Sequence, residues 1–103
     1  MRRVVWSNDA LNEFDQIIDH IARDDPRAAV GVADRIDETV LALAEMPVGR
    51  QGRVAGTYEK VVVGLPYIIA YALSRGPTGD ETLTILRIIH GARNWPEGAW
   101  PER

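Results

Sequence analysis

The chain has 103 residues, and its 12 Lys and Arg against 15 Asp and Glu give a formal net charge of −3. This length suits a single domain spanning residues 1–103, and a hydrophobic content of 46% is enough for a core, which argues against disorder. The absence of cysteine excludes disulfides and Cys-ligated zinc or iron–sulfur sites.

No segment has the composition of a membrane span. The longest apolar run, residues 61–73, contains Gly64 and Pro66 and is shorter than the roughly 20 apolar residues that cross a bilayer. Near the N-terminus, Asn8 and Asp9 interrupt the apolar residues too early for a signal peptide. We therefore expect a cytoplasmic protein.

Charge is unevenly distributed along the chain. Residues 8–46 carry ten acidic and three basic side chains, whereas residues 47–103 carry seven basic and five acidic ones. A protein that binds a duplex by itself usually presents a strongly basic face, because phosphate contacts supply much of the affinity. We expect no direct sequence-specific nucleic-acid binding, although a few arginines remain in the second half.

The first 46 residues predict one strand followed by two helices. Residues 4–6 are β-prone, and Ser7, Asn8 and Asp9 are all favourable N-cap residues. Apolar residues then recur with helical spacing, at Leu11, Phe14, Ile18 and Ile21 in the first helix and at Ala29, Val32, Ile36, Val40 and Leu43 in the second. The intervening Asp24-Asp25-Pro26 predicts a short turn, so the two helices should form a hairpin.

Beyond residue 50 the pattern changes to that of strands. Residues 57–63, 67–73 and 82–89 are rich in β-branched and aromatic side chains, with Gly and Pro between them. Residues 91–103 should be irregular. The order β-α-α-β-β-β predicts an α+β fold, a two-layer domain whose helical hairpin packs on a mainly antiparallel four-stranded sheet.

The residue patterns of common cofactor sites are missing from the sequence. His20 and His90 are 70 positions apart and show no metal-ligand spacing, so we expect no metal site. Gly49, Gly52 and Gly56 follow a helix and precede a strand, the reverse of a phosphate-binding loop. We therefore expect no cofactor.

A charged residue within the last predicted strand requires a partner. Strand alternation places Arg87 with Leu83 and Ile85 on one face, and an unpaired buried charge is costly. Glu59 on an earlier strand is the obvious candidate. The pair is either a structural ion pair that fixes strand register, or an acid/base pair acting with His90 on a phosphodiester. Residue types alone leave both interpretations open.

Several short stretches together resemble one known family. They are VWS at 5–7, DPRAA at 25–29, PVGR at 47–50, GRVAGTYE at 52–59, PYIIAY at 66–71 and ILRIIHGAR at 85–93, followed by Trp95-Pro96. In this order they resemble the RelE/ParE superfamily of toxin–antitoxin toxins, and its ParE branch in particular. The resemblance covers residues 4–96.

The resemblance implies a toxin of a type II toxin–antitoxin system, neutralised by a ParD-like antitoxin. RelE-like members cleave ribosome-bound mRNA, whereas ParE-like members inhibit DNA gyrase. This sequence has Tyr67 where many ribonuclease members carry a catalytic arginine, and Gly91 where some carry an aromatic acid/base. It is therefore predicted to inhibit gyrase without a catalytic residue, by stabilising the cleaved-DNA complex. The alternative is an mRNA endoribonuclease that uses Glu59, Arg87 and His90.

Two sets of contact residues follow as hypotheses from the resemblance. The target-binding set is Arg93, Trp95 and Trp100, with Arg53 and Tyr58, because Trp and Arg are the usual interface anchors. Trp95 has the alternative role of capping the core. The antitoxin is expected in a groove beside the helical hairpin, at those of its residues that the core leaves available: Leu11, Phe14, Ile36, Val40 and Leu43.

Overall fold

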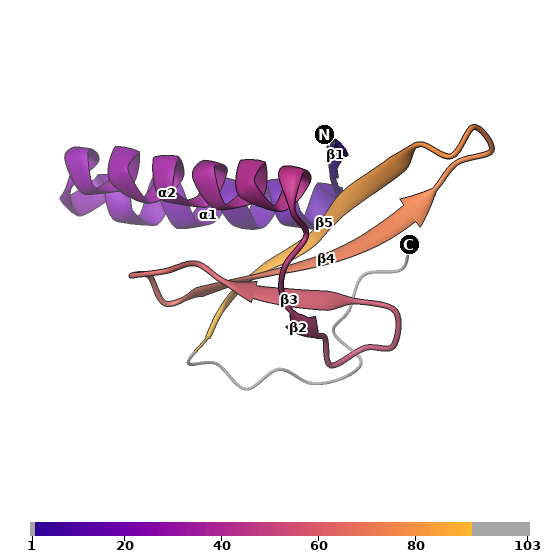
Figure 1. Ribbon diagram of the computed structural model, residues 1–103. Coiled ribbons are helices and arrows are strands. Elements are labelled where there is room, and N and C mark those ends of the chain that lie inside the picture. The colour runs from indigo at the N-terminus through magenta and orange to yellow at the C-terminus, as the bar shows by residue number, and fades with distance from the viewer. Residues whose placement is uncertain (1, 92–103) are drawn as a thin grey trace.

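The computed structural model describes residues 2–91 (Figure 1). Its elements in chain order are β1 (Arg3–Trp6), α1 (Asn8–Asp24), α2 (Pro26–Glu45), β2 (Arg50–Gln51), β3 (Tyr58–Val61), β4 (Tyr67–Arg75) and β5 (Glu81–His90). Both helices lie on one face of the sheet, as Figure 1 shows, so the predicted two-layer α+β architecture is confirmed. Neither helix in this part of the chain is both long and apolar enough to cross a membrane.

Local capping determines where each helix begins. The Ser7 hydroxyl accepts a hydrogen bond from the Ala10 N–H at 3.0 Å, which caps α1. Asp25 ends one helix and starts the next: its own N–H donates to the Ile21 carbonyl, and its carboxylate accepts the Ala28 N–H at 3.1 Å. With Pro26 in the first turn of α2, a single residue joins the two helices of the predicted hairpin.

The sheet has five strands in the order β1-β5-β4-β3-β2. Strand β1 runs parallel to β5, and all other pairs are antiparallel. The prediction of four strands is wrong, because it lacks β2. This strand has only two residues, Arg50 and Gln51, which pair with Glu59 and Tyr58 of β3. Two polar residues carry no alternating pattern that could mark a strand in the sequence.

A β-bulge in β5 changes which side chains share a face. Ala70 pairs with Arg87 and Tyr71 with Ile85, so Leu86 is the extra residue. Ile85 and Ile88 consequently both join the core beneath the helices. The expectation that Arg87 shares a face with Ile85 is therefore wrong, because simple alternation fails at the bulge.

The core lies between the hairpin and the sheet. Its largest fully buried side chains come from α2 and from the central strands: Ile36, Leu43, Val62, Ile69, Tyr71, Leu83 and Ile85. Burying each large apolar side chain contributes roughly 1.5–3 kcal/mol to the free energy of folding. The Tyr71 hydroxyl is satisfied within this core by donating to the Val48 carbonyl at 3.2 Å.

Candidate functional site

Glu59 is a buried carboxylate at the β2 edge of the sheet, with only 2% of its side chain exposed. Its Oε1 lies 3.4 Å from Nη2 of Arg50. Its Oε2 accepts the backbone N–H of Arg53 at 2.9 Å and lies 3.6 Å from Nε of the same residue. The predicted partnership of Glu59 with Arg87 is therefore wrong, because two nearer arginines bind this carboxylate.

Arg87 instead pairs with Glu13 of α1. Its Nε donates to Glu13 Oε2 at 2.8 Å, and its Nη2 binds the same oxygen, while Glu13 Oε1 accepts the Ile88 N–H at 3.1 Å. The hydrogen bond to Glu13 is the main reason that the pKa of Arg87 is raised above its ordinary value. Strand β1 ends at Trp6, so it does not extend alongside Ile88 of β5. The Glu13 carboxylate accepts the Ile88 N–H in place of a strand partner.

Sequence reasoning missed Glu13, although one signal was present. Glu13 follows the fully buried Ala10 by three residues and precedes Ile17, which packs against the core, by four. These spacings place residues on one helix face, so Glu13 is a charged residue on the buried face of α1. Such a residue should prompt a search for a buried cation.

The residues of the alternative catalytic set are not brought together. Glu59 pairs in register with Ala70, which pairs with Arg87, so β4 separates the two charged residues. With about 4.8 Å between neighbouring strands, their backbones lie roughly 10 Å apart. The His90 ring meets the Tyr67 ring edge-on, with ring centroids 5.7 Å apart. By strand alternation, His90 shares a face with the core residue Ile88 and faces away from Arg87.

Of the predicted target-binding residues, Arg53 and Tyr58 fall in the described part. The Arg53 side chain is 39% exposed beside Glu59. Tyr58 is half-buried and stacks on Tyr71 with ring centroids 5.5 Å apart. Burial and, secondarily, Tyr58 raise the pKa of Tyr71. Arg93, Trp95 and Trp100 lie outside the described residues.

Most of the predicted antitoxin contacts belong to the core. Ile36, Val40 and Leu43 are buried beneath α2, so the core does not leave them available and the prediction narrows to Leu11 and Phe14. Their helical spacing is that of core residues as much as of an interface, so the pattern could not separate the two. Phe14 is half-buried and packs edge-on against Trp6 at 5.5 Å. Leu11 is 45% exposed and remains accessible.

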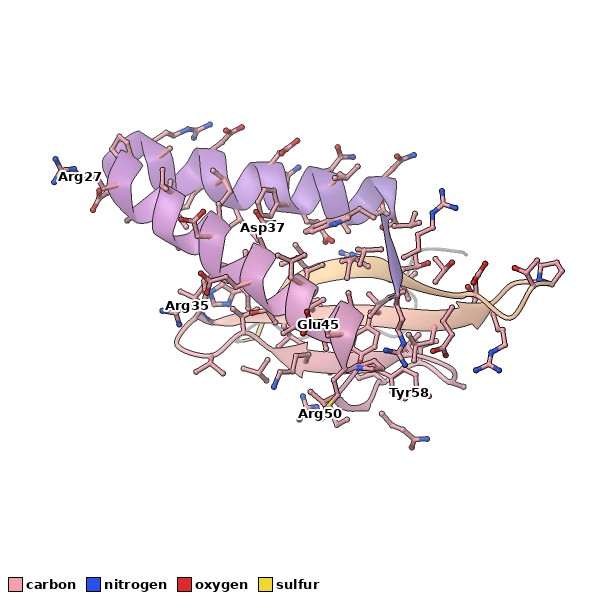
Figure 2. The ribbon with its side chains drawn as sticks, turned by 45° about the horizontal axis from the view of Figure 1, so that its top comes forward. Arg27, Arg35, Asp37, Glu45, Arg50 and Tyr58 are labelled. Atoms are coloured by element: carbon pink, nitrogen blue, oxygen red, sulfur yellow. The ribbon has the colours of Figure 1, made fainter. Side chains whose placement is uncertain are left out.

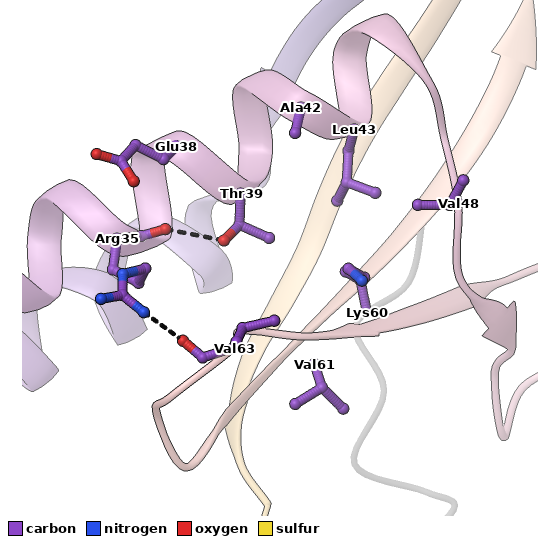
Figure 3. Close-up of a pocket in the computed structure, with 9 residues that line it drawn as sticks. All are labelled: Arg35, Glu38, Thr39, Ala42, Leu43, Val48, Lys60, Val61 and Val63. Atoms are coloured by element: carbon purple, nitrogen blue, oxygen red, sulfur yellow. Dashed lines mark hydrogen bonds between the residues drawn. The ribbon is translucent and has the colours of Figure 1, made fainter.

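A groove of about 210 Å³ lies between α2 and β3 (Figure 3). We call it the α2–β3 groove; its walls include Glu38, Thr39 and Ala42 of the helix and Val48, Lys60 and Val63 of the strand side. At one end, the Arg35 Nη1 donates to the Val63 carbonyl at 2.6 Å. In residues 2–91, β2 pairs with β3 only as far as Glu59, so the outer edge of β3 at Val61 has no strand beside it.

Within residues 2–91, no group of three or more His, Cys, Asp or Glu is placed to hold a metal ion. The charged clusters in the same range are ion pairs between arginines and carboxylates. What they offer chemically is recognition of charged partners and rigid support of the loop beside Glu59.

Comparison with known proteins gives four related matches. A family model described as the ParE toxin of the type II toxin–antitoxin system parDE matches residues 4–95. The chain is 41% identical over 97 residues to Y4kP of Sinorhizobium fredii (93% of this chain, 95% of that protein). It is 37% identical over 94 residues to the toxin RelE2 of Caulobacter vibrioides (90% and 99%). A chain of the chromosomal ParDE TA system from P. aeruginosa has the same fold, with a TM-score of 0.75 at 24% identity over 87% of this chain and 96% of that one.

Proposed function

This chain belongs to the ParE toxin family of type II toxin–antitoxin systems, and from that premise we propose that it inhibits DNA gyrase by binding and stabilising the enzyme's cleaved-DNA complex. Such an inhibitor needs only a higher affinity for one state of its target than for the others. The proposed target is cytoplasmic, and so is the proposed site of action. A ParD-like antitoxin is the proposed neutralising partner.

The observation that carries this proposal is the separation of the candidate catalytic groups. Arg87 is bound to Glu13, Glu59 is bound to Arg50 and Arg53, and His90 lies against Tyr67. General acid–base catalysis requires its groups within hydrogen-bonding reach of one reacting centre. The arrangement thus supports a mechanism based on binding.

Gyrase supercoiling tests the proposal directly. Purified toxin should reduce supercoiling of a relaxed plasmid by gyrase, and the antitoxin encoded beside it should restore supercoiling. Full supercoiling activity at a several-fold excess of toxin would contradict the proposal.

The 37% identical relative named RelE2 supports a second candidate, ribosome-dependent mRNA cleavage. Here Glu59, Arg87 and His90 would be the residues to substitute. Primer extension on translated mRNA with purified toxin should then show new 5′ ends, which Arg87→Ala abolishes. Under the gyrase proposal, the mRNA stays intact.

For the antitoxin, we propose docking in the α2–β3 groove. Val48, Val61 and Val63 are exposed apolar side chains at this groove, and the open edge of β3 offers backbone hydrogen bonds. An exposed edge of this kind binds an extended segment, whose alternate side chains enter the adjacent pocket. The family description as a toxin–antitoxin system supplies the partner class.

Substitution of Val63 tests this docking site, because this residue is 69% exposed and contributes little to the core. Val63→Glu should weaken antitoxin binding at least tenfold in calorimetry, since it places a charge in an apolar contact. Leu41→Glu is the matched control, because Leu41 is an exposed α2 residue that does not line the groove. Equal weakening by both variants, or by neither, would exclude the groove as the dock.

A further inference from the structure

The α2–β3 groove contains the single lysine of the 103-residue sequence. Lys60 lies in β3 and pairs in register with Ile69, a fully buried core residue. Residues directly opposite each other on neighbouring strands share a face of the sheet, so Lys60 leaves β3 on the face that the helices cover. Figure 3 shows it on the side of β3 that faces α2.

The surroundings of Lys60 in the groove are mainly apolar. The apolar residues of the walls are Ala42, Leu43, Val48, Val61 and Val63. Lys60 itself is half-buried between them. Partial burial excludes part of the surrounding water, so a charge in the groove gains more from an ion pair than a fully exposed charge does.

The other polar groups of the groove leave the Lys60 charge without a partner. Arg35 Nη1 donates to the Val63 carbonyl at 2.6 Å, and Thr39 Oγ1 donates to the Arg35 carbonyl at 2.8 Å. Glu38 is exposed on α2, and no carboxylate in residues 2–91 lies within 4.0 Å of the Lys60 ammonium. With Arg35 and Lys60 against Glu38, the groove has a net charge of +1 beside an acidic helical segment.

The described part of the chain does not use the charge of Lys60. The methylene stem of a lysine packs on apolar neighbours, a role that an uncharged methionine of similar length also fills. Within residues 2–91, the ammonium makes neither a hydrogen bond nor an ion pair. A positive charge in an apolar groove therefore indicates a negatively charged group on the molecule that occupies the groove.

We propose that Lys60 forms an ion pair with an Asp or Glu side chain of the antitoxin segment in the α2–β3 groove. An extended segment along the open edge of β3 directs alternate side chains toward α2, and one of these reaches Lys60. This inference rests on the proposed antitoxin dock and makes Lys60 a specificity-determining residue. An antitoxin with an apolar or basic residue at that position would leave the ammonium unpaired in the complex.

Calorimetric titration of the purified full chain with the purified antitoxin encoded beside it tests the ion pair. Lys60→Met keeps the stem and removes the charge, so it should weaken binding about tenfold. Lys60→Arg keeps the charge and should weaken binding by less than about threefold. Arg27→Met is the matched control, because Figure 2 shows Arg27 beside the α1–α2 turn and it does not line the groove. Thermal melts of all three variants check that they fold.

The acidic partner is identified by changing each Asp and Glu of the antitoxin to its amide, one at a time. One amide variant should weaken binding to the wild-type toxin but not to Lys60→Met, because that toxin variant already lacks the ion pair. Acetylation with an N-hydroxysuccinimide ester gives a second readout, because the chain has one lysine and mass spectrometry can follow it alone. Excess antitoxin should slow the acetylation of Lys60.

Unchanged affinity of Lys60→Met, or the same loss in Arg27→Met, would overturn the inference. It would also be overturned if every amide variant weakened binding equally to the wild type and to Lys60→Met. Loss of binding in Val63→Glu with normal binding in Lys60→Met would contradict only the ion pair, whereas normal binding in both would contradict the dock as well. Gyrase that is unaffected by the toxin would contradict only the proposed target, since the titration contains no gyrase.

Discussion

Glu13 connects α1 to the edge of β5 through three N–H groups, two from the Arg87 guanidinium and one from the Ile88 backbone. Both side chains of the ion pair are about one-fifth exposed, so water screens the pair less than it screens a surface pair. Removing the carboxylate leaves a partly buried cation and an unpaired backbone donor.

Glu13→Ala should therefore lower the free energy of unfolding by about 2 kcal/mol. Urea denaturation monitored by circular dichroism measures this change. Asp19→Ala, at an exposed acidic residue of the same helix, is the matched control and should change stability by no more than about 0.5 kcal/mol. Equal effects of the two substitutions would show that the Glu13–Arg87 pair contributes nothing specific.

Asp37 provides a pH-dependent test at the residue scale. Partial burial, and then the neighbouring Asp34, raise the pKa of Asp37. At neutral pH, keeping the Asp37 carboxylate charged therefore costs free energy in the folded state. That penalty disappears as the pH falls below the usual pKa of aspartate, near 4, because the folded state binds the proton first. Asp37→Asn should raise the melting temperature at pH 7 on the order of 1–2 °C and have a smaller effect near pH 3. The same gain at both pH values in thermal melts would contradict this explanation.

At the scale of elements, the sequence predicts those features that depend on neighbouring residues. Ser7 and Asp25-Pro26 define the starts of both helices through caps of a few residues, and alternation predicts β4 and most of β5. The bulge at Leu86 and the pairing of Arg87 with Glu13 depend on contacts between distant segments, which no local pattern encodes. The candidate site is less predictable than the fold because it also depends on such contacts. Glu59 meets its arginine partners through the pairing of β3 with β2, a strand of only two residues.

Two glycines, one in helix α2 and one in the connection that follows it, should respond oppositely to alanine substitution. A Cβ added to Gly31 in α2 would have no neighbouring atom within 4 Å, so Gly31→Ala should stabilise the protein by roughly 0.5–1 kcal/mol. Gly49→Ala should destabilise it by about 1–3 kcal/mol, because its Cβ would lie 2.9 Å from the Glu59 carbonyl oxygen and the Tyr71 hydroxyl. Chemical denaturation measures the stability of both variants. An unchanged stability of Gly49→Ala would show that the backbone around Gly49 shifts easily to make room for the Cβ.

At the scale of the whole molecule, the distribution of charge bears on the proposed antitoxin complex. The helical segment 8–46, with ten acidic side chains against three basic ones, favours a basic antitoxin segment. Raising the salt concentration should weaken the antitoxin complex, because screening reduces attraction between exposed charges. Calorimetric titrations at roughly 50 and 500 mM KCl measure the change, and these span Debye lengths from about 14 to 4 Å. An affinity independent of salt would mean that the acidic helices take no part in the complex.

The proposal that this ParE-family toxin stabilises cleaved DNA on gyrase is tested most directly by trapping cleavage complexes. Supercoiled plasmid, gyrase and toxin are incubated, the protein is denatured and digested, and linear DNA is measured with and without antitoxin. Linear DNA should accumulate with toxin and return to background when antitoxin is added first. Background levels of linear DNA at every toxin concentration would contradict the proposed mechanism.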